Sequence, residues 1–379
     1  MNLLFIVPST FPQRGGVERV SFLLARELHE RGINCFSLSL HCAELNLESK
    51  YKANCKYVAN SNIILQCVQQ HHIDIVINQL PMVGSIVSEL SKLKYAKIIS
   101  CFHGSPTFYR DNLRIELTYP FFSVRKLRAI LKRCLLLVYE PYGRIFRKAY
   151  NESSAFLLLS ARNIEIFKNE YKFISDKKFY SIENPLSFNE YFEDSYEAKE
   201  RIVLIVSRLS DRDKRISLLL KVWAEIENKE ETESWRLVIV GGGNDQDSLC
   251  QLAQNLSLKK CSFEGPRKNV IDYYRRASIF IFASSNEGWG MVLTEAMQMG
   301  CVPIAFGTYS ALLDIIKNGE NGIIVEEGNI PKYVEELLSL MRDTARREQM
   351  AKNAVSYSKQ FAIGTIADKW VHLFKKIMG

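Results

Sequence analysis

The chain has 379 residues, of which 47% are hydrophobic and 24% are charged, and its formal net charge is +8. This length exceeds that of a usual single domain, so we expect two globular domains with sizeable cores. No run of 18 apolar residues occurs, which excludes a membrane-spanning helix, and the nine cysteines form no CxxC pair, which argues against a zinc site or a disulfide framework.

The first half of the chain alternates short apolar runs with helical patterns. Leu3–Val7 has the continuous apolar character of a buried strand, and 17–31 has the spacing of an amphipathic helix that Gly32 ends. Further strands are expected at 35–40, 73–78, 97–102 and 154–160. This alternation predicts a parallel sheet with helices on both faces.

Two loops of this half are candidate ligand sites. Gly15-Gly16 opens the first helix, where a phosphate can approach the backbone, although a Gly-Gly pair is also an ordinary tight turn. His103 follows the strand 97–102 at its carboxyl end, where open α/β sheets bind ligands; a lone histidine in a loop is also often structural.

The segment Phe121–Tyr150 carries eight basic residues against one acid, Glu140, with leucines and aromatic residues between them. A basic amphipathic stretch of this kind is typical of binding to an anionic membrane surface. A solvated basic face over a core helix explains it equally well. No RNP, zinc-finger or helix-turn-helix pattern accompanies the charge, so we expect no nucleic-acid binding.

A domain boundary is expected between residues 185 and 200, because Asn184-Pro185 is a turn signal before a new apolar strand, Ile202–Val206. The second half repeats the alternation, with strands expected at 236–240, 263–265, 277–283, 302–306 and 322–325. The stretch Lys332–Tyr357 is expected to be helical and charged, and the tail Ile366–Ile377 is expected to be an amphipathic helix.

Two cations follow the strand Ile202–Val206. Arg208 and Lys214 stand where they can neutralise a diphosphate leaving group, although surface cations are common. Gly241–Gly243 makes a similar strand-to-turn junction, but it is not GxGxxG and has no acidic residue placed for a dinucleotide.

The segment SSNEGWGMVLTEAMQMG, residues 284–300, combines a strand end, a glycine turn and a helix that begins near Val292. Such a helix N-terminus offers free N–H groups to an anion. Glu287 and Glu295 bracket the turn with seven residues between them, so each can face one half of a nucleotide sugar. An acid near a helix start also simply complements the helix dipole.

These residues, with the continuation EGWGMVLTEAMQMGCVPIAF, resemble the Glu-x7-Glu motif of glycosyltransferase family 4, whose members are retaining enzymes of the GT-B fold. The resemblance covers most of the chain. It implies two Rossmann-like, doubly wound α/β domains facing a cleft: an acceptor-side domain at 1–185 and a donor-binding domain at 186–360. The helix 361–379 is expected to cross back to the first domain.

The resemblance also implies a site, since family members show a Gly-Gly loop, a histidine and an Arg/Lys pair at similar places. Arg208 and Lys214 would neutralise the leaving diphosphate, and Glu287 would hold sugar hydroxyls that His103 reaches from the other domain. Glu295 would bind the ribose, and the backbone of Gly15, Gly16, Gly290, Met291 and Val292 would approach the donor. The family usually has glycine after the lysine, whereas Arg215 stands here.

The function implied is transfer of a sugar, with retention, from a nucleotide sugar to a saccharide or lipid-linked acceptor in polysaccharide, lipopolysaccharide or glycolipid biosynthesis. No metal or other cofactor is expected. We expect a cytoplasmic protein, peripheral at the inner membrane face if 121–150 binds lipid. The alternatives are a nucleotide-sugar epimerase of the same fold and an inactive partner subunit, although a partner subunit would normally have lost Glu287, Lys214 or Arg208.

Overall fold

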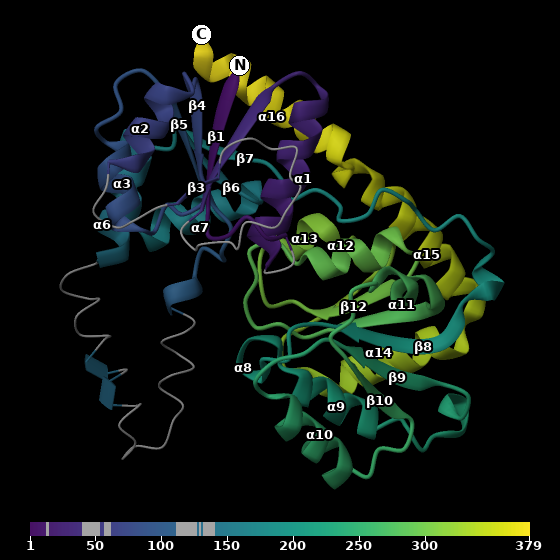
Figure 1. The fold of residues 1–379 in the computed structure, drawn as a ribbon. Helices are drawn as coiled ribbons and strands as arrows, with labels where there is room; N and C mark the ends of the chain where they lie inside the picture. The colour runs from purple at the N-terminus through teal and green to yellow at the C-terminus, as the bar shows by residue number, and fades with distance from the viewer. Residues whose placement is uncertain (13–14, 40–53, 57–61, 111–126, 129, 132–140) are drawn as a thin grey trace. The chain divides into compact units, whose positions relative to one another are not determined.

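The computed structural model describes residues 1–12, 15–39, 54–56, 62–110, 127–128, 130–131 and 141–379. They form two compact units (Figure 1). Unit 1 comprises Met1–Pro185 and Ile363–Gly379, and unit 2 comprises Leu186–Ala362. The chain therefore leaves unit 1 once and returns to it with its last helix.

Unit 1 is built on a seven-stranded parallel sheet in the order β3-β2-β1-β4-β5-β6-β7. Its strands are β1 (Asn2–Val7), β2 (Asn34–Ser39), β3 (Asn54–Lys56), β4 (Ile75–Asn78), β5 (Lys97–Phe102), β6 (Ala155–Leu158) and β7 (Phe179–Ser181). Its helices are α1 (Gly16–Glu30), α2 (Ile63–Gln70), α3 (Gly84–Leu90), α6 (Pro141–Glu152), α7 (Ala161–Glu170) and α16 (Ile363–Met378).

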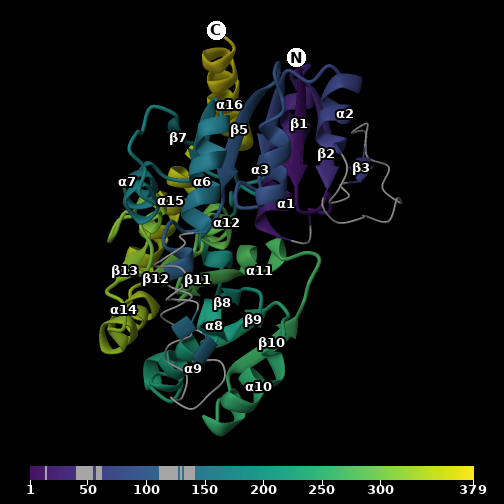
Figure 2. The same cartoon turned by 90° about the vertical axis from the view of Figure 1, so that its left-hand side faces the viewer.

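Alternate side chains of these strands enter two different cores. Leu3 and Phe5 of β1 pack with α1 and α16, whereas Leu4 and Ile6 pack with α2 and α3. Both faces of the sheet are therefore buried, which is why its strands are almost continuously apolar. Figure 2 shows α2 and α3 beside the sheet, and α16 contacts α1 on the other face.

Unit 2 is built on a six-stranded parallel sheet in the order β10-β9-β8-β11-β12-β13. Its strands are β8 (Glu200–Val206), β9 (Arg236–Val240), β10 (Cys261–Gly265), β11 (Ala277–Phe282), β12 (Val302–Phe306) and β13 (Ile323–Val325). Its helices are α8 (Asp211–Lys214), α9 (Ile216–Ala224), α10 (Gln246–Asn255), α11 (Ile271–Arg276), α12 (Met291–Gln298), α13 (Leu312–Ile315), α14 (Ile330–Arg342) and α15 (Thr344–Ser358).

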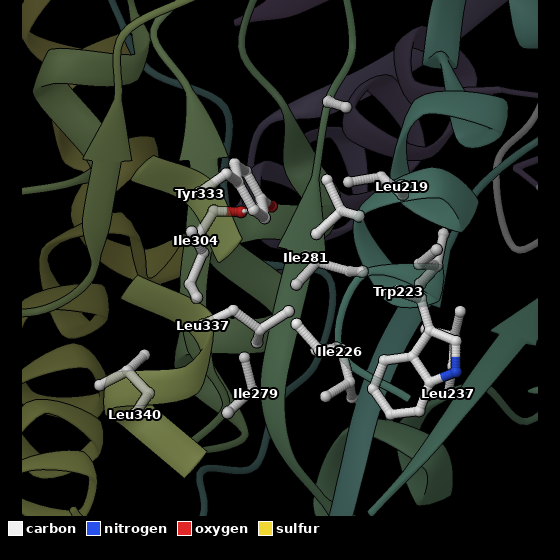
Figure 3. Close-up of a cluster of buried hydrophobic side chains, with 14 of the residues drawn as sticks. Leu219, Trp223, Ile226, Leu237, Ile279, Ile281, Ile304, Tyr333, Leu337 and Leu340 are labelled. Carbon is white, nitrogen blue, oxygen red and sulfur yellow. Dashed lines mark hydrogen bonds between the residues drawn. The ribbon is translucent and has the colours of Figure 1, made fainter. Parts of the chain in front are cut away.

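The core of unit 2 lies between its sheet and helices α9, α10 and α14 (Figure 3). Trp223 and Tyr333 are completely buried there, and each satisfies its polar atom. The indole of Trp223 donates to Glu227 at 3.0 Å, and the hydroxyl of Tyr333 donates to the carbonyl of Ile304 at 2.7 Å. These bonds let large aromatic side chains fill the core without a desolvation penalty on their polar ends.

The helical character expected of Lys332–Tyr357 is confirmed, and the stretch consists of two helices, α14 and α15. They are separated at Asp343, which has φ −93° and ψ 90°. The carboxylate of Asp343 accepts from the N–H of Arg346 at 2.9 Å and so caps α15. Aspartate is a strong N-cap residue, and here it starts a new helix inside a charged pattern.

Candidate functional site

Lys214 and Glu287 form an ion pair in unit 2, although 73 positions separate them in the chain. Lys214 is the last residue of α8, and Glu287 lies in the loop after β11. The ammonium donates to Glu287 Oε1, and the two side chains are only 20% and 18% exposed. The structure thus brings together a cation and an acid that the sequence predicted as site residues.

Arg208 lies on the same edge of the sheet but is far more exposed. Its guanidinium reaches Asp213 at 3.5 Å with 70% of its side chain exposed. The backbone carbonyl of Asp213 in turn accepts from the N–H of Ser285 at 2.9 Å. Asp213 therefore joins the loop after β8 to the loop after β11, and Arg208 is left able to reorient toward a ligand.

Gly290 precedes α12 and needs to be glycine for two reasons. Its φ is +97°, and a Cβ there would stand 2.5 Å from the hydroxyl oxygen of Tyr309. That hydroxyl donates to the carbonyl of Trp289 at 2.9 Å, and burial, followed by the charge of Glu287, raises the pKa of Tyr309 well above its usual value. Tyr309 therefore supports the glycine turn as a neutral donor.

No side chain caps α12 at Gly290, so the N–H groups of its first turn, including those of Met291 and Val292, are not satisfied by a cap. Together with the dipole of the helix, they form a surface suited to an anion. Glu287 lies a few residues before this helix start and pairs with Lys214. Backbone N–H groups at a helix start are donors that a phosphate oxygen can use, and the contacts of Gly290, Met291 and Val292 with a donor stay predictions.

Glu295 has different surroundings from Glu287. It is 2% exposed, and its two carboxylate oxygens accept from the hydroxyls of Ser187 at 2.5 Å and Tyr274 at 3.0 Å. The carboxylate of Glu295 is therefore held in place by two hydroxyl donors. No short-range pattern indicates Ser187 or Tyr274, because the fold brings them from distant parts of the sequence.

Arg215 shows how the chain departs from the usual glycine after the lysine. Its φ is +49° and its ψ is +44°, the left-handed conformation that glycine adopts without strain. The side chain compensates: Nε donates to the carbonyl of Ala283 at 2.6 Å, and Nη1 pairs with Glu327 at 3.0 Å. Arg215 therefore adopts the backbone conformation that is typical of glycine, the residue that the family usually has here.

In unit 1, Gly15 is extended, with φ −174°, and precedes the first turn of α1 without a side-chain cap. A Cβ at Gly15 would stand 2.7 Å from a carboxylate oxygen of Glu18. An acid therefore already complements the N-terminus of α1. A donor phosphate at Gly15 and Gly16 would have to displace this carboxylate.

His103 follows β5 and contacts Gln79, which follows the neighbouring strand β4. His103 Nε2 lies 2.5 Å from Gln79 Oε1. His103 Nδ1 is buried and has no hydrogen-bond partner in the part of the chain that the structure describes. Burial lowers the pKa of His103 to about 4, so the imidazole is neutral at pH 7.

Part of the basic segment 121–150 lies outside the described residues. In its described part, α6 buries Phe146, and Arg147 and Lys148 bond to the carbonyl of Tyr171 and the hydroxyl of Ser88. Leu127, Ile130 and Leu131 are 69%, 40% and 62% exposed. α6 therefore packs on the core of unit 1, whereas Leu127, Ile130 and Leu131, which precede it in the chain, are exposed.

No group of three or more metal-ligating side chains occurs among the described residues. Cys35, Cys67, Cys101, Cys250, Cys261 and Cys301 are free thiols. In the described parts, no helix combines the length and the apolar composition needed to cross a bilayer.

Several solved structures cover this chain almost completely. The Anabaena protein Alr3699/HepE, solved with UDP and glucose, is 18% identical with a TM-score of 0.75 and covers 99% of this chain and 100% of its own. Sucrose-phosphate synthase from Thermosynechococcus elongatus is 15% identical with a TM-score of 0.78 and covers 100% and 99%. This likeness confirms the predicted fold class, with two Rossmann-like domains of the GT-B type.

Curated relatives match over part of their length. An uncharacterized glycosyltransferase of Haemophilus influenzae is 31% identical over 158 residues, which are 41% of this chain and 44% of the relative. An α-1,4-N-acetyl-D-galactosaminyltransferase of Campylobacter jejuni, named for an undecaprenol-linked acceptor, is 28% identical over 213 residues, 54% and 58%. The chain thus spans about half the length of the curated relatives it matches.

The family model described as "Glycosyl transferases group 1" matches residues 187–356. This range is nearly all of unit 2 and includes the ion pair, the glycine turn and Glu295. Over this domain, the chain is similar to the group 1 glycosyl transferases.

Proposed function

We propose that the protein is a retaining glycosyltransferase that moves a sugar from a nucleotide-sugar donor to an acceptor hydroxyl. The observation that carries this proposal is the Lys214–Glu287 pair beside the uncapped N-terminus of α12. The arrangement supplies a cation and backbone N–H groups for a diphosphate, and an acid for sugar hydroxyls, within a group 1 glycosyl transferase domain.

In the proposed reaction, the acceptor hydroxyl attacks the anomeric carbon on the face that the diphosphate leaves. The bond from that carbon to the phosphate oxygen breaks, the new glycosidic bond forms, and the phosphate oxygen takes the acceptor's proton. Lys214 and Arg208 stabilise the charge that grows on the diphosphate. Glu287 orients the sugar hydroxyls, and Glu295 binds the ribose diol.

The mechanism assigns the diphosphate charge to protein cations and the α12 N-terminus, so we propose that no metal cofactor is required. Turnover with and without excess EDTA tests this part. Equal rates support it, and a rate abolished by EDTA and restored by Mg²⁺ or Mn²⁺ would contradict it.

A panel of nucleotide sugars tests the donor. UDP sugars come first, because the Anabaena neighbour was solved with UDP. A true ligand at about 100 times its Kd stabilises the protein by about 2.7 kcal/mol, which a thermal shift detects. The stabilised donor is then incubated with and without acceptors. Conversion of the donor sugar without any acceptor indicates an epimerase, and no conversion with any acceptor favours an inactive partner subunit.

We propose a saccharide or lipid-linked acceptor, because the Campylobacter relative is named for an undecaprenol-linked one.

The basic charge of 121–150 and the exposed Leu127, Ile130 and Leu131 favour docking on an anionic membrane. About 1 kcal/mol per engaged cation gives reversible binding, which salt weakens. Docking is tested by sedimentation with anionic liposomes. We expect the protein to bind them at low salt and to be released at high salt, and the double variant Arg128→Glu/Leu131→Glu to lose binding. Equal binding to neutral and anionic vesicles would contradict membrane docking through charge.

A further inference from the structure

Unit 2 has a cavity at the edge of its sheet that lies opposite Lys214 and Glu287. It measures about 260 Å³ and lies between the amino ends of β8 and β11 and the first half of α15. The segments that carry Lys214 and Glu287 follow the carboxyl ends of these same two strands, so the cavity is separate from the proposed donor site. A water molecule occupies roughly 30 Å³, so a small organic molecule fits in the cavity.

Two arginines line the cavity, and two adjacent residues hold them there. Arg201, at the start of β8, donates to the hydroxyl of Ser234 at 2.5 Å. The guanidinium of Arg347, on α15, lies 5.2 Å from the centre of the Trp235 ring and donates to the carbonyl of Met341 at 3.2 Å. Because Ser234 and Trp235 are neighbours in the chain, the two guanidinium groups are held near each other.

The charges of these two arginines are not balanced by an ion pair within the described residues. Arg201 bonds to a hydroxyl, and Arg347 bonds to the hydroxyl of Thr344 and to carbonyls at the end of α14. Burial lowers the pKa of Arg347, the charge of Glu348 opposes this, and the charge of Arg201 lowers the pKa further. A guanidinium has five N–H donors, so both arginines keep donors for a ligand. An anion bound between them would relieve their repulsion.

The cavity also has acceptors. Glu197 and Glu348 line it, and neither carboxylate accepts a hydrogen bond in the part of the chain that the structure describes. A carboxylate accepts readily from a hydroxyl and repels a second anionic group. The lining therefore suits a molecule with one anionic group and several hydroxyls better than it suits a nucleoside diphosphate.

We propose that this cavity is a binding site for a small sugar phosphate. Arg201 and Arg347 bind the phosphate, because its charge of about −1.5 to −2 at pH 7 balances two guanidinium groups and its oxygens match their paired N–H donors. A single carboxylate would balance only one of them. Glu197 and Glu348 accept hydrogen bonds from the sugar hydroxyls. The inference goes beyond the proposed function, and its test needs neither a donor nor turnover.

The four tryptophans allow the cavity and the donor site to be read separately. In protein labelled with 5-fluorotryptophan, each ¹⁹F signal is assigned by its loss in a Trp→Phe variant. Trp235 lies beside Arg347, whereas Trp289 lies in the glycine turn before α12. The probes are glucose 1-phosphate, glucose 6-phosphate, fructose 6-phosphate and ribose 5-phosphate. We expect at least one of them to shift the Trp235 signal. No shift of Trp235 with any of them, or a shift of Trp289 alone, would overturn the inference.

Inorganic phosphate and glucose test the two parts of the ligand. Glucose lacks the group that the arginines bind, so it is expected to leave the Trp235 signal unchanged. Inorganic phosphate lacks the hydroxyls, so it is expected to bind about tenfold more weakly than the best sugar phosphate. Equal affinities for phosphate and all four sugar phosphates, or a shift with glucose alone, would contradict a sugar phosphate as the ligand.

Arg201→Gln tests the phosphate contact, since Arg201 is exposed and the bonds of Arg347 to α14 do not depend on it. The variant is expected to bind the sugar phosphate about tenfold more weakly, because charge-assisted hydrogen bonds are lost. Arg342→Gln, which removes an exposed arginine at the end of α14 outside the cavity, is the control and keeps the affinity of the wild type. An unchanged affinity in Arg201→Gln, with thermal unfolding like that of the wild type, would overturn the assignment.

Discussion

At the scale of single residues, Lys214 and Arg208 differ more than their sequence spacing indicates. Lys214 is mostly buried and paired with Glu287, whereas Arg208 is largely exposed. An ion pair shielded from water is screened less by salt and is more rigid than an exposed one. We therefore expect Lys214 to contribute more to transition-state stabilisation than Arg208.

Lys214→Ala is expected to lower kcat by about 100-fold, because it removes one preorganised charge from the leaving diphosphate. Donor binding weakens less than kcat, since the charge on the leaving group grows toward the transition state. Steady-state kinetics with the donor found by thermal shift measure both effects. Lys221→Ala, an exposed lysine on α9, is the matched control, and full activity of Lys214→Ala would remove Lys214 from the mechanism.

Glu295→Gln is expected to weaken UDP binding by about tenfold, because a charged acceptor for the ribose diol becomes a neutral one. The carboxylate also holds Ser187 and Tyr274, so a loss of stability alone is not evidence for a ribose contact. Tyr274→Phe removes one of those internal bonds and is the control. Calorimetric titration of UDP decides: similar affinities in Glu295→Gln and wild type would leave Glu295 a structural residue.

The sequence led to some of these residues and not to others. Glu287 and Lys214 were found because a charged residue beside a glycine turn or a strand end is a local signal. Ser187 and Tyr274 gave no such signal, because each is an ordinary polar residue until the fold sets it against Glu295. The roles of all these residues stay predictions.

At the scale of elements, the junction between α8 and α9 contains a residue in a backbone conformation that its side chain disfavours. Arg215 occupies a left-handed conformation at the end of α8 that costs a side chain roughly 1–2 kcal/mol. Its bonds to Ala283 and Glu327 tie the junction to the ends of β11 and β13. The same residue therefore strains the junction and holds it in place beside Lys214.

Arg215→Ala and Arg215→Gly separate these two effects. Both lose the side-chain bonds, but only glycine relieves the backbone strain, so the glycine variant is expected to be more stable than the alanine variant by about 1 kcal/mol. Urea unfolding measures the difference. Arg342→Ala and Arg342→Gly, at the end of α14, give the reverse order because there glycine only loses helix propensity. Alanine equal to or better than glycine at 215 would show that the conformation is not strained.

Elements with a strong local pattern were predicted well. β1, β5 and β9 are apolar runs because both faces of their sheets are covered. β3 consists of three residues, Asn-Cys-Lys, with no apolar run to indicate a strand. Asp343 divides α14 from α15 inside one charged, helix-forming stretch, where hydrophobic periodicity does not distinguish a cap from a surface acid.

At the scale of the whole molecule, the two units differ in how the chain builds them. Unit 2 is continuous, whereas unit 1 needs α16 from the far end of the chain. Ile366, Trp370 and Phe374 of α16 are buried against the strands of unit 1, and Arg31 of α1 donates to the carbonyl of Gly364 at 2.9 Å. Residues 363–379 are therefore a structural part of unit 1.

Trp370→Ala is expected to destabilise unit 1 by about 3–5 kcal/mol, the cost of removing a large buried aromatic side chain. Unit 2, which contains none of these contacts, should keep its stability. Hydrogen exchange read by mass spectrometry on peptides from β1 and β8 separates the units. Lys375→Ala, on the exposed face of α16, is the control, and equal loosening of both peptides would show that the units unfold together.

The return of α16 to unit 1 has a consequence for synthesis on the ribosome. The first strands of unit 1 are made before Leu186–Ala362, but the helix that covers one of their faces is made after it. At about 5–20 residues per second, this interval lasts roughly 10–35 s. During that time the apolar face that α16 will cover is open to solvent while unit 2 is completed. The nascent chain therefore offers a binding site for a chaperone on unit 1, and the arrival of α16 closes it.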